Sequence, residues 1–391
     1  MRELKKIISN SIDYSNFSEE VEILSAMRVG SNYYIYTARN KNGVTFRHVP
    51  GIAGLSGRGI MGYVNGDRAR PVMIGPSHAK QINSSSFMYG GDGFFAGGYS
   101  TENLSVIDTI DISTLSDALS FGNLSTARRG LAACANTSRG VFGGGAGNAG
   151  NLNSMEYITF ASAGNAVTFG DLIKTCISRV GTSSYSTSRG LFAGGFGNGG
   201  LYGYANEIEY ITISSTGNAT DFGDLTLHRY ALAAASDNSR ALFAGGAWIE
   251  GGGVFAHETA LIDYITIATL GNASNFGNLT QKRQGVAGCS NTTRAVFGGG
   301  SLGYDGSVSY NILDYVTIAS TGNAIDFGDL TTNRNPIASC ASSGRGLFAG
   351  GSNGNALQSI DYIAIASTGN ATDFGDLTGA RTNAAGCAAS Q

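Results

Sequence analysis

The sequence predicts an all-β protein: a six-bladed β-propeller preceded by a small β-barrel domain. Three observations lead to the propeller. A unit of about 50 residues recurs six times. Each copy divides into four short apolar stretches. The 391 residues include 59 glycines but only 4 prolines, which is typical of many tight turns between short strands. Four antiparallel strands repeated six times indicate a propeller rather than a solenoid, because blades packed around an axis leave few exposed sheet edges.

Two aromatic positions define the repeat. A phenylalanine in an FGD or FGN segment recurs at Phe121, Phe169, Phe222, Phe276, Phe327 and Phe374. An aromatic residue before a glycine pair recurs with the same period, at Phe95, Phe142, Phe192, Phe243, Phe297 and Phe348. Six copies of both anchors predict six blades.

Each unit contains four stretches of strand length. Examples of the first three are ALAAAS (231–236), ALFAGG (241–246) and IEYITIS (208–214), and the fourth surrounds the FGD phenylalanine. β-Branched or aromatic residues bounded by Gly, Asn and Ser favour strands over helices. The glycine pair allows a close approach of backbone where the second strand ends.

The two ends of the repeat region complement each other. The last first-strand stretch, TNAAGCAAS (382–390), has no second, third or fourth strand after it, and the first unit begins at Gln81 without a first strand. We therefore expect a propeller over residues 81–391 whose C-terminal strand completes the first blade.

Charged residues recur in register with the strands. One set of arginines precedes the first strand: Arg128, Arg179, Arg229, Arg283, Arg334 and Arg381. A second set precedes the second strand: Arg139, Arg189, Arg240, Arg294 and Arg345. The recurrent acidic residues are Asp108, Glu156, Glu209, Asp263, Asp314 and Asp361. Since identical chemistry in every unit is what structure needs and a unique active site does not, a ring of charged pairs at the blade junctions is expected.

Four of the five cysteines follow the repeat as well. Cys134, Cys289, Cys340 and Cys387 each lie six residues after the repeat arginine, where other units place Tyr185 and Ala235. They are interpreted as small apolar residues of the inner strands, too far apart for a disulfide or a closed zinc site. Cys176 is assigned to a three-residue expansion between Leu172 and Arg179.

Composition and motifs argue against several function classes. The net charge is −3 and no Lys/Arg run exceeds Lys5-Lys6, so no nucleic-acid partner is expected. The N-terminal stretch has no apolar h-region and no apolar run approaches bilayer length, so we expect no membrane insertion and folding in a cytoplasm. The four histidines show no metal-ligand spacing, and no nucleophile elbow or phosphate loop is present. No catalytic residue, metal or cofactor is predicted.

The repeat resembles the Kelch repeat: an arginine opens the first strand, a glycine pair closes the second, and an acidic-tyrosine pair lies on the third. The resemblance covers about residues 82–391, with phenylalanine where Kelch repeats usually carry tryptophan. The repeated motifs are similar to repeats in virion and tail-associated proteins of tailed bacteriophages; they are Asp/Glu-Tyr-Ile-Thr-Ile, Gly-Asn-Ala and Phe-Gly-Asp-Leu. This resemblance implies a virion protein assembled in the host cytoplasm, as a homo-oligomer within the particle.

Residues 1–80 form a different domain. Strand-like stretches at 33–38 and 44–49 flank Asn42-Gly43, and a further stretch contains NGDRARPVMIG (65–75). The latter looks like the closing hairpin of oligonucleotide/oligosaccharide-fold (OB) modules in phage tail and secretion-spike proteins; a generic β-hairpin is the alternative. The OB resemblance implies a small barrel that docks the chain to other virion proteins.

Function is expected in what the repeats do not share. The separation between the glycine-pair phenylalanine and the acidic residue grows from 13 residues in the first unit to 20 in the fourth and returns to 13 in the sixth. The enlarged loops of units three to five lie on the face that carries the blade connections, and their flat side chains suit glycan or protein contact. The candidate ligand-binding residues are Phe196, Tyr202, Tyr204, Trp248, Phe255, His257, Tyr304 and Tyr310.

Three functions remain open at this point. The leading hypothesis is a non-enzymatic structural protein of the phage tail region that displays its propeller for host attachment, to a surface glycan or protein receptor. The first alternative is a tail or capsid component whose propeller only packs against neighbouring subunits. The second is a carbohydrate-active enzyme, which needs a carboxylate pair facing a cleft.

Overall fold

A computed structural model describes residues 92–183, 189–197, 203–249, 256–303 and 308–389, together with the backbone of five strands between residues 21 and 73. The chain divides into two compact units, residues 1–86 and residues 87–391.

The described backbone of the first unit forms one antiparallel sheet whose strands pair in sequence order. The strands are β1 (Val21–Val29), β2 (Tyr33–Asn40), β3 (Thr45–His48), β4 (Met61–Tyr63) and β5 (Val72–Met73). Much of the predicted barrel lies outside the described residues, so the OB-like interpretation and its docking role stay predictions.

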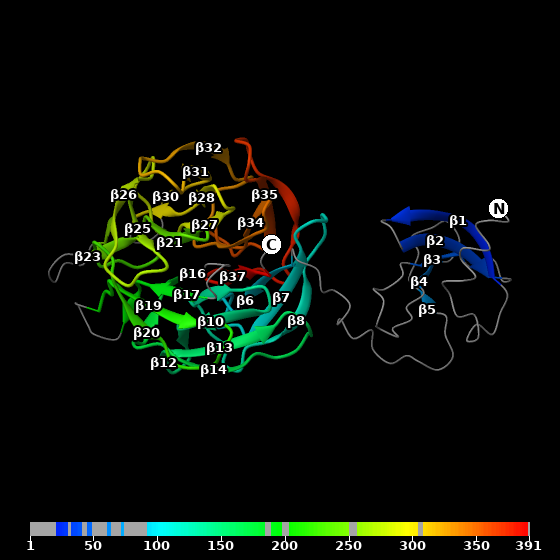
Figure 1. Cartoon of the computed structure of the whole chain (residues 1–391), viewed down its shortest axis with the longest axis horizontal. Coiled ribbons are helices and arrows are strands. Elements are labelled where there is room, and N and C mark those ends of the chain that lie inside the picture. Colours follow the sequence, from blue (N-terminus) through cyan, green and yellow to red (C-terminus); the bar gives the residue numbers. More distant parts are fainter. Residues whose placement is uncertain are drawn as a thin grey trace. The chain divides into compact units, whose positions relative to one another are not determined.

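The described part of the second unit forms six four-stranded antiparallel sheets around one axis, which confirms the six-bladed propeller (Figure 1). The inner strands are β37 (Ala385–Ala388), β9 (Ala132–Ala135), β16 (Val180–Ser183), β21 (Ala233–Ser236), β27 (Ala287–Ser290) and β33 (Ala338–Ala341). The second strands are β6 (Asp92–Ala96), β10 (Arg139–Gly143), β17 (Arg189–Ala193), β22 (Arg240–Ala244), β28 (Arg294–Gly298) and β34 (Arg345–Ala349).

The remaining two strands of each blade lie progressively further from the axis. The third strands are β7 (Val106–Asp111), β13 (Ser154–Thr159), β19 (Glu207–Thr212), β25 (Leu261–Thr266), β31 (Ile312–Thr317) and β35 (Ser359–Ala364). The outer strands are β8 (Leu119–Asn123), β14 (Val167–Asp171), β20 (Thr220–Asp224), β26 (Ser274–Asn278), β32 (Ile325–Asp329) and β36 (Thr372–Asp376). Blades are numbered one to six from the blade that contains β6.

The first blade joins the two ends of the propeller. Strand β37 pairs antiparallel with β6, with Ala385 opposite Ala96 and Cys387 opposite Phe94. This is the pairing expected from the unmatched strand at the end of the repeats. It covers the inner edge of β6, so the ring is closed by hydrogen bonds rather than by a covalent link.

The hydrophobic core lies between adjacent blades. One cluster combines Phe276 and Leu279 of the fourth blade with Phe297 and Val316 of the fifth, all buried. The FGD/FGN phenylalanine also packs edge-on against the tyrosine of the third strand, as between Phe276 and Tyr264 with ring centroids 5.8 Å apart. Each blade therefore buries its faces only by contact with its neighbours, which is the physical reason for the repeat.

Candidate functional site

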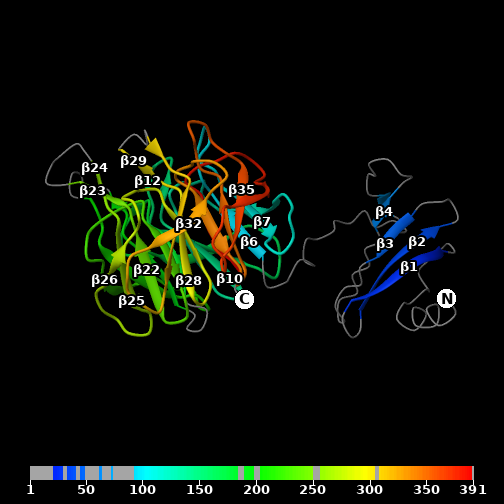
Figure 2. The ribbon, with the colours of Figure 1, turned by 90° about the horizontal axis from the view of Figure 1, so that it is seen from above.

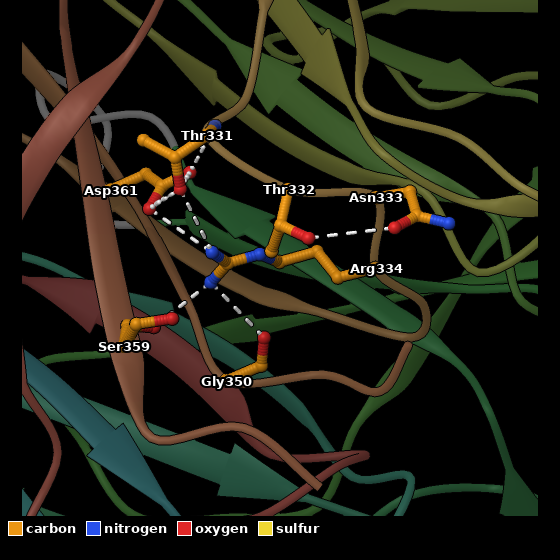
Figure 3. A network of polar contacts seen from close by, with 7 residues as sticks. All are labelled: Thr331, Thr332, Asn333, Arg334, Gly350, Ser359 and Asp361. Carbon is orange, nitrogen blue, oxygen red and sulfur yellow. Dashed lines mark hydrogen bonds and ion pairs between the residues drawn. The ribbon is translucent and has the colours of Figure 1, made fainter. Parts of the chain in front are cut away.

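The connections between blades carry the first set of repeated arginines, and each arginine forms a buried ion pair with the next blade. Arg283 Nη1 lies 3.0 Å from Asp314 Oδ2, and both side chains are fully buried. Thr280 donates to the same carboxylate from its backbone N–H at 3.1 Å and its hydroxyl at 2.6 Å. Figure 3 shows the equivalent network around Arg334 and Asp361. The six pairs are Arg128–Glu156, Arg179–Glu209, Arg229–Asp263, Arg283–Asp314, Arg334–Asp361 and Arg381–Asp108.

Burial determines what these pairs contribute. Desolvation lowers the pKa of Arg283, and the neighbouring Asp314 carboxylate acts in the opposite direction. The energy of taking both charges out of water is recovered only while the pair and its extra hydrogen bonds remain intact. The pairs therefore fix the position of one blade against the next, and loss of either partner leaves a buried uncompensated charge.

The second set of arginines bridges blades in another way. The Arg240 guanidinium lies 4.9 Å from the ring centroid of Tyr264 in the same blade. Its Nη1 donates to the carbonyls of Ile318 and Ala319 in the next blade at 3.1 and 2.9 Å. Arg139, Arg189, Arg294 and Arg345 repeat this arrangement. The expectation of acidic partners thus holds for the first set, whereas the second set uses tyrosine rings and carbonyls.

The connection between the second and third blades corrects two interpretations made from the sequence. Leu172 precedes Thr182 by ten residues, as Leu225 precedes Ala235, so the connection contains no expansion. Thr182 lies opposite Leu191 in the sheet, which is the place of Ala235 in the next blade. The inner-strand equivalent of the cysteines is therefore Thr182. The residue assigned there from the sequence, Tyr185, lies outside the described residues.

In the same connection a cysteine stands at the position of the repeated arginine, and the arginine comes later in the chain. Cys176 stands four residues after Leu172, where the other connections place the arginine. Arg179 comes three residues later, yet its Nη1 reaches Glu209 Oε1 at 2.7 Å. A long, flexible arginine can start from a different backbone position and still reach the carboxylate. Cys176 is buried, and burial raises the pKa of its thiol.

The inner strands surround a narrow central cavity of about 70 Å³. Residues of all six inner strands line it, including the four cysteines of the repeat. These thiols are free and buried, and burial raises the pKa of each. Pockets for drug-sized ligands are roughly 300–1,000 Å³, so this cavity has room only for a few water molecules.

Cysteines of the inner strands fit against glycines of the next blade. A Cβ atom added to Gly190 would lie 2.4 Å from Cys134 Sγ. The pairs Cys289–Gly346, Cys340–Gly93 and Cys387–Gly140 show the same close approach. At the equivalent positions of the two remaining junctions, Thr182 and Ala235 precede blades that carry Ala241 and Ala295. A sulfur therefore occurs only where the next blade leaves room for it.

The loops between second and third strands lie on the face that carries the blade connections. Tyr230 of one connection pairs with Ala247, and Gln284 of the next pairs with Ser301. Short hairpins extend several of these loops, and Figure 2 shows β12, β23, β24 and β29 along the same edge of the propeller. The short loop strands are β11 (Ala146–Gly147), β12 (Gly150–Asn151), β18 (Phe196–Gly197), β23 (Ala247–Ile249), β24 (Ala256–Glu258), β29 (Ser301–Leu302) and β30 (Val308–Ser309); β15 (Cys176–Ile177) pairs with β18.

Six rings of the third and fourth blades form a continuous set, named here the aromatic cluster. Phe196 and Tyr204 come from the third blade's loop, His228 and Tyr230 from the following connection, and Trp248 and His257 from the β23–β24 hairpin. Centroid distances are 5.1 Å for Phe196–Tyr204, 5.6 Å for Tyr204–Tyr230, 6.1 Å for Tyr204–His228, 6.0 Å for His228–Trp248 and 5.1 Å for Trp248–His257. His228 and His257 are exposed, and the other four rings are half-buried.

The structure brings together four of the candidate residues predicted from the sequence: Phe196, Tyr204, Trp248 and His257. Tyr310 belongs to the fifth blade's loop, where its backbone N–H donates to the Gly300 carbonyl at 2.8 Å, and it is not part of the cluster. Tyr202, Phe255 and Tyr304 lie outside the described residues.

Sequence reasoning missed His228 and Tyr230. Both belong to a connection, a segment that the repeated arginine marks as structural. The signal lies beside that arginine: at these two positions the connection between the fourth and fifth blades has Lys282 and Gln284, and the connection between the fifth and sixth has Asn333 and Asn335. Two rings in one connection were therefore visible as a departure from the repeat.

No protein-family model matches this chain, and a search of curated proteins gives no match. Within the described ranges, the structure shows no group of three His, Cys, Asp or Glu side chains placed to hold a metal ion. The same ranges contain no helix with the length and apolar character of a membrane span.

Proposed function

We propose that this chain is a non-enzymatic structural protein of a phage tail region and that its propeller attaches the particle to the host surface. The similarity of its repeats to those of virion and tail-associated proteins supports the assignment to a phage tail region. In this proposal the propeller binds a surface glycan or a surface protein, and residues 1–80 dock the chain to other virion proteins.

One observation carries the attachment role: repeated polar residues serve blade junctions, whereas non-repeated rings gather on one face. All six carboxylates that recur in register on the third strands are held in buried ion pairs. The aromatic cluster comes from three segments that differ from their counterparts in other units, and two of its rings are exposed. Exposed rings on loops that a rigid scaffold holds are typical of binding surfaces.

The test is binding of the fluorescently labelled full-length chain to a panel of bacterial strains, measured by flow cytometry. We expect saturable binding to some strains and not others, and competition between the free chain and particle adsorption. Imaging of the intact particle should place the propeller on its surface. A propeller buried among neighbouring subunits, together with no binding to any strain to which the particle adsorbs, would contradict the proposal and favour a purely structural role.

A further inference from the structure

The aromatic cluster has two layers. Phe196, Tyr204 and Tyr230 contact one another and are half-buried, so they form a supporting layer. Trp248, also half-buried, lies between His228 at 6.0 Å and His257 at 5.1 Å, and both imidazoles are exposed. His257 is held opposite Trp248 by the strand pairing of β23 and β24. A ligand on this face therefore meets an indole with an imidazole on each side.

The chemistry of this outer layer suits a sugar better than an apolar protein surface. An imidazole ring offers a hydrogen-bond donor or acceptor at each nitrogen, and the indole offers one N–H donor beside a large apolar face. Sugars present the matching combination of C–H faces and hydroxyl edges. Among the described residues, no exposed large aliphatic side chain belongs to the cluster: Leu119, Val167 and Ile325 lie on outer strands, and Val308 lies in the fifth blade's loop.

The arrangement of the rings is a row rather than a pocket. His257, Trp248 and His228 follow one another with centroid distances of 5.1 and 6.0 Å, from the fourth blade's hairpin to the connection that joins the third and fourth blades. Tyr204 of the supporting layer lies 6.1 Å from His228 on the third-blade side. A row of this kind contacts several successive units of an extended chain, each through a small area. A single terminal sugar would instead be enclosed by a cavity that covers most of its surface.

We infer that the aromatic cluster binds a polysaccharide lengthwise across the third and fourth blades. Trp248 is the main stacking surface, and His228 and His257 hydrogen-bond sugar hydroxyls on either side of it. This inference rests on the proposed attachment function and specifies its ligand. Phe196, Tyr204 and Tyr230 position the outer rings from below.

A matched control residue lies on the same face. Tyr99 follows the glycine pair of the first blade, as Phe196 does in the third. Its ring stacks with the Arg129 guanidinium at 4.9 Å, and it is half-buried. Tyr99→Ala therefore removes a loop aromatic of comparable exposure without touching the cluster.

The experiment uses the full-length chain and purified bacterial surface polysaccharides: capsular, O-antigen and exopolysaccharide preparations from strains that the chain labels. A preparation that binds is fractionated into fragments of two to eight sugars, and affinity is measured by calorimetry. We expect affinity to rise at least tenfold from the shortest to the longest fragment, a difference of about 1.4 kcal/mol. Trp248→Ala should weaken binding of the longest fragment at least tenfold and remove the length dependence, whereas Tyr99→Ala should bind as the unaltered chain does.

A conservative variant, His257→Phe, keeps the test valid if Trp248→Ala fails to fold. His257→Phe retains a ring but removes its polar edge, so binding should weaken while the melting temperature stays the same. Equal affinity for the shortest and longest fragments would overturn lengthwise binding, and unchanged binding by Trp248→Ala would overturn the assignment of the site. Cell binding that survives periodate oxidation of glycans but not protease treatment would identify a protein receptor and overturn the ligand class. These three outcomes leave the attachment function standing, whereas absence of binding to any strain would contradict attachment itself.

Discussion

The blade junctions and the aromatic cluster use similar residues in opposite ways. At the junctions, the ring of Tyr264 lies under an arginine and edge-on to a phenylalanine, and four other blades repeat this arrangement. In the cluster, Tyr230 and Trp248 belong to a chain of rings from three segments, and two imidazoles of this chain remain exposed. Side chains that recur in every unit hold the blades together, and in our proposal the rings that break the repeat bind a ligand.

The largest effect should come from opening the ring. Removal of residues 382–391 deletes β37, exposes the inner edge of β6 and takes away Cys387 and its buried neighbours. Because every blade is covered only by its neighbours, we expect loss of cooperative folding, measured as a broad, low-temperature transition by circular dichroism and rapid proteolysis. A chain shortened by its last two residues, which retains β37, is the control. A sharp transition at the original temperature in the longer deletion would show that closure contributes little.

The second effect concerns one buried junction. Asp314→Ala should destabilise the protein by about 3–5 kcal/mol, because it leaves the Arg283 guanidinium buried without its counterion. Lys174→Ala breaks the exposed pair with Glu207 and should change stability by less than about 1 kcal/mol. Urea denaturation of both variants gives the comparison directly. Similar losses in the two variants would mean that the junction pairs act as ordinary surface charges.

The third effect tests the fit of cysteine to glycine between blades. Gly190→Ala places a methyl group 2.4 Å from Cys134 Sγ, and overpacking of this kind costs about 1–3 kcal/mol. In a Cys134→Ala background the same substitution should cost clearly less, because the sulfur is gone. Free energies of unfolding of the two single variants and the double variant measure the coupling. Additive losses would show that the two positions do not constrain each other.

Much of the propeller could be predicted because its determinants are repeated and local. The six copies of the FGD/FGN phenylalanine and of the glycine pair give the number of blades. The unmatched stretch at 382–390 indicates that the C-terminal strand closes the propeller. The connection between the second and third blades was misaligned because the repeats were aligned on arginine, whose long side chain tolerates a shift of three positions. An anchor at Leu172, whose spacing to the inner strand is fixed by backbone pairing, places Cys176 and Thr182 correctly.

The candidate site was predicted in part, for a related reason. Loop length identified the enlarged loops and hence Trp248 and His257. It could not identify His228 and Tyr230, because a connection of normal length gives no such signal. Their contact with the loops depends on the pairing of Tyr230 with Ala247, a contact that only the folded blade creates.

The smallest effect on stability should come from the aromatic cluster, and it separates a ligand site from a hydrophobic lid. Trp248→Ala should change the free energy of unfolding by less than about 1 kcal/mol, because loop tips add little to the blade cores. Tyr264→Ala, which removes a junction ring packed between Arg240 and Phe276, should cost several times more, approaching the roughly 3–5 kcal/mol of a buried aromatic truncation. Thermal melting of the two variants, read together with their binding to cells, makes the distinction. If Trp248→Ala loses as much stability as Tyr264→Ala and loses binding in proportion, then the cluster rings cover the blade tops as a hydrophobic lid. In that case both regions stabilise the fold, and the cluster is not a ligand site.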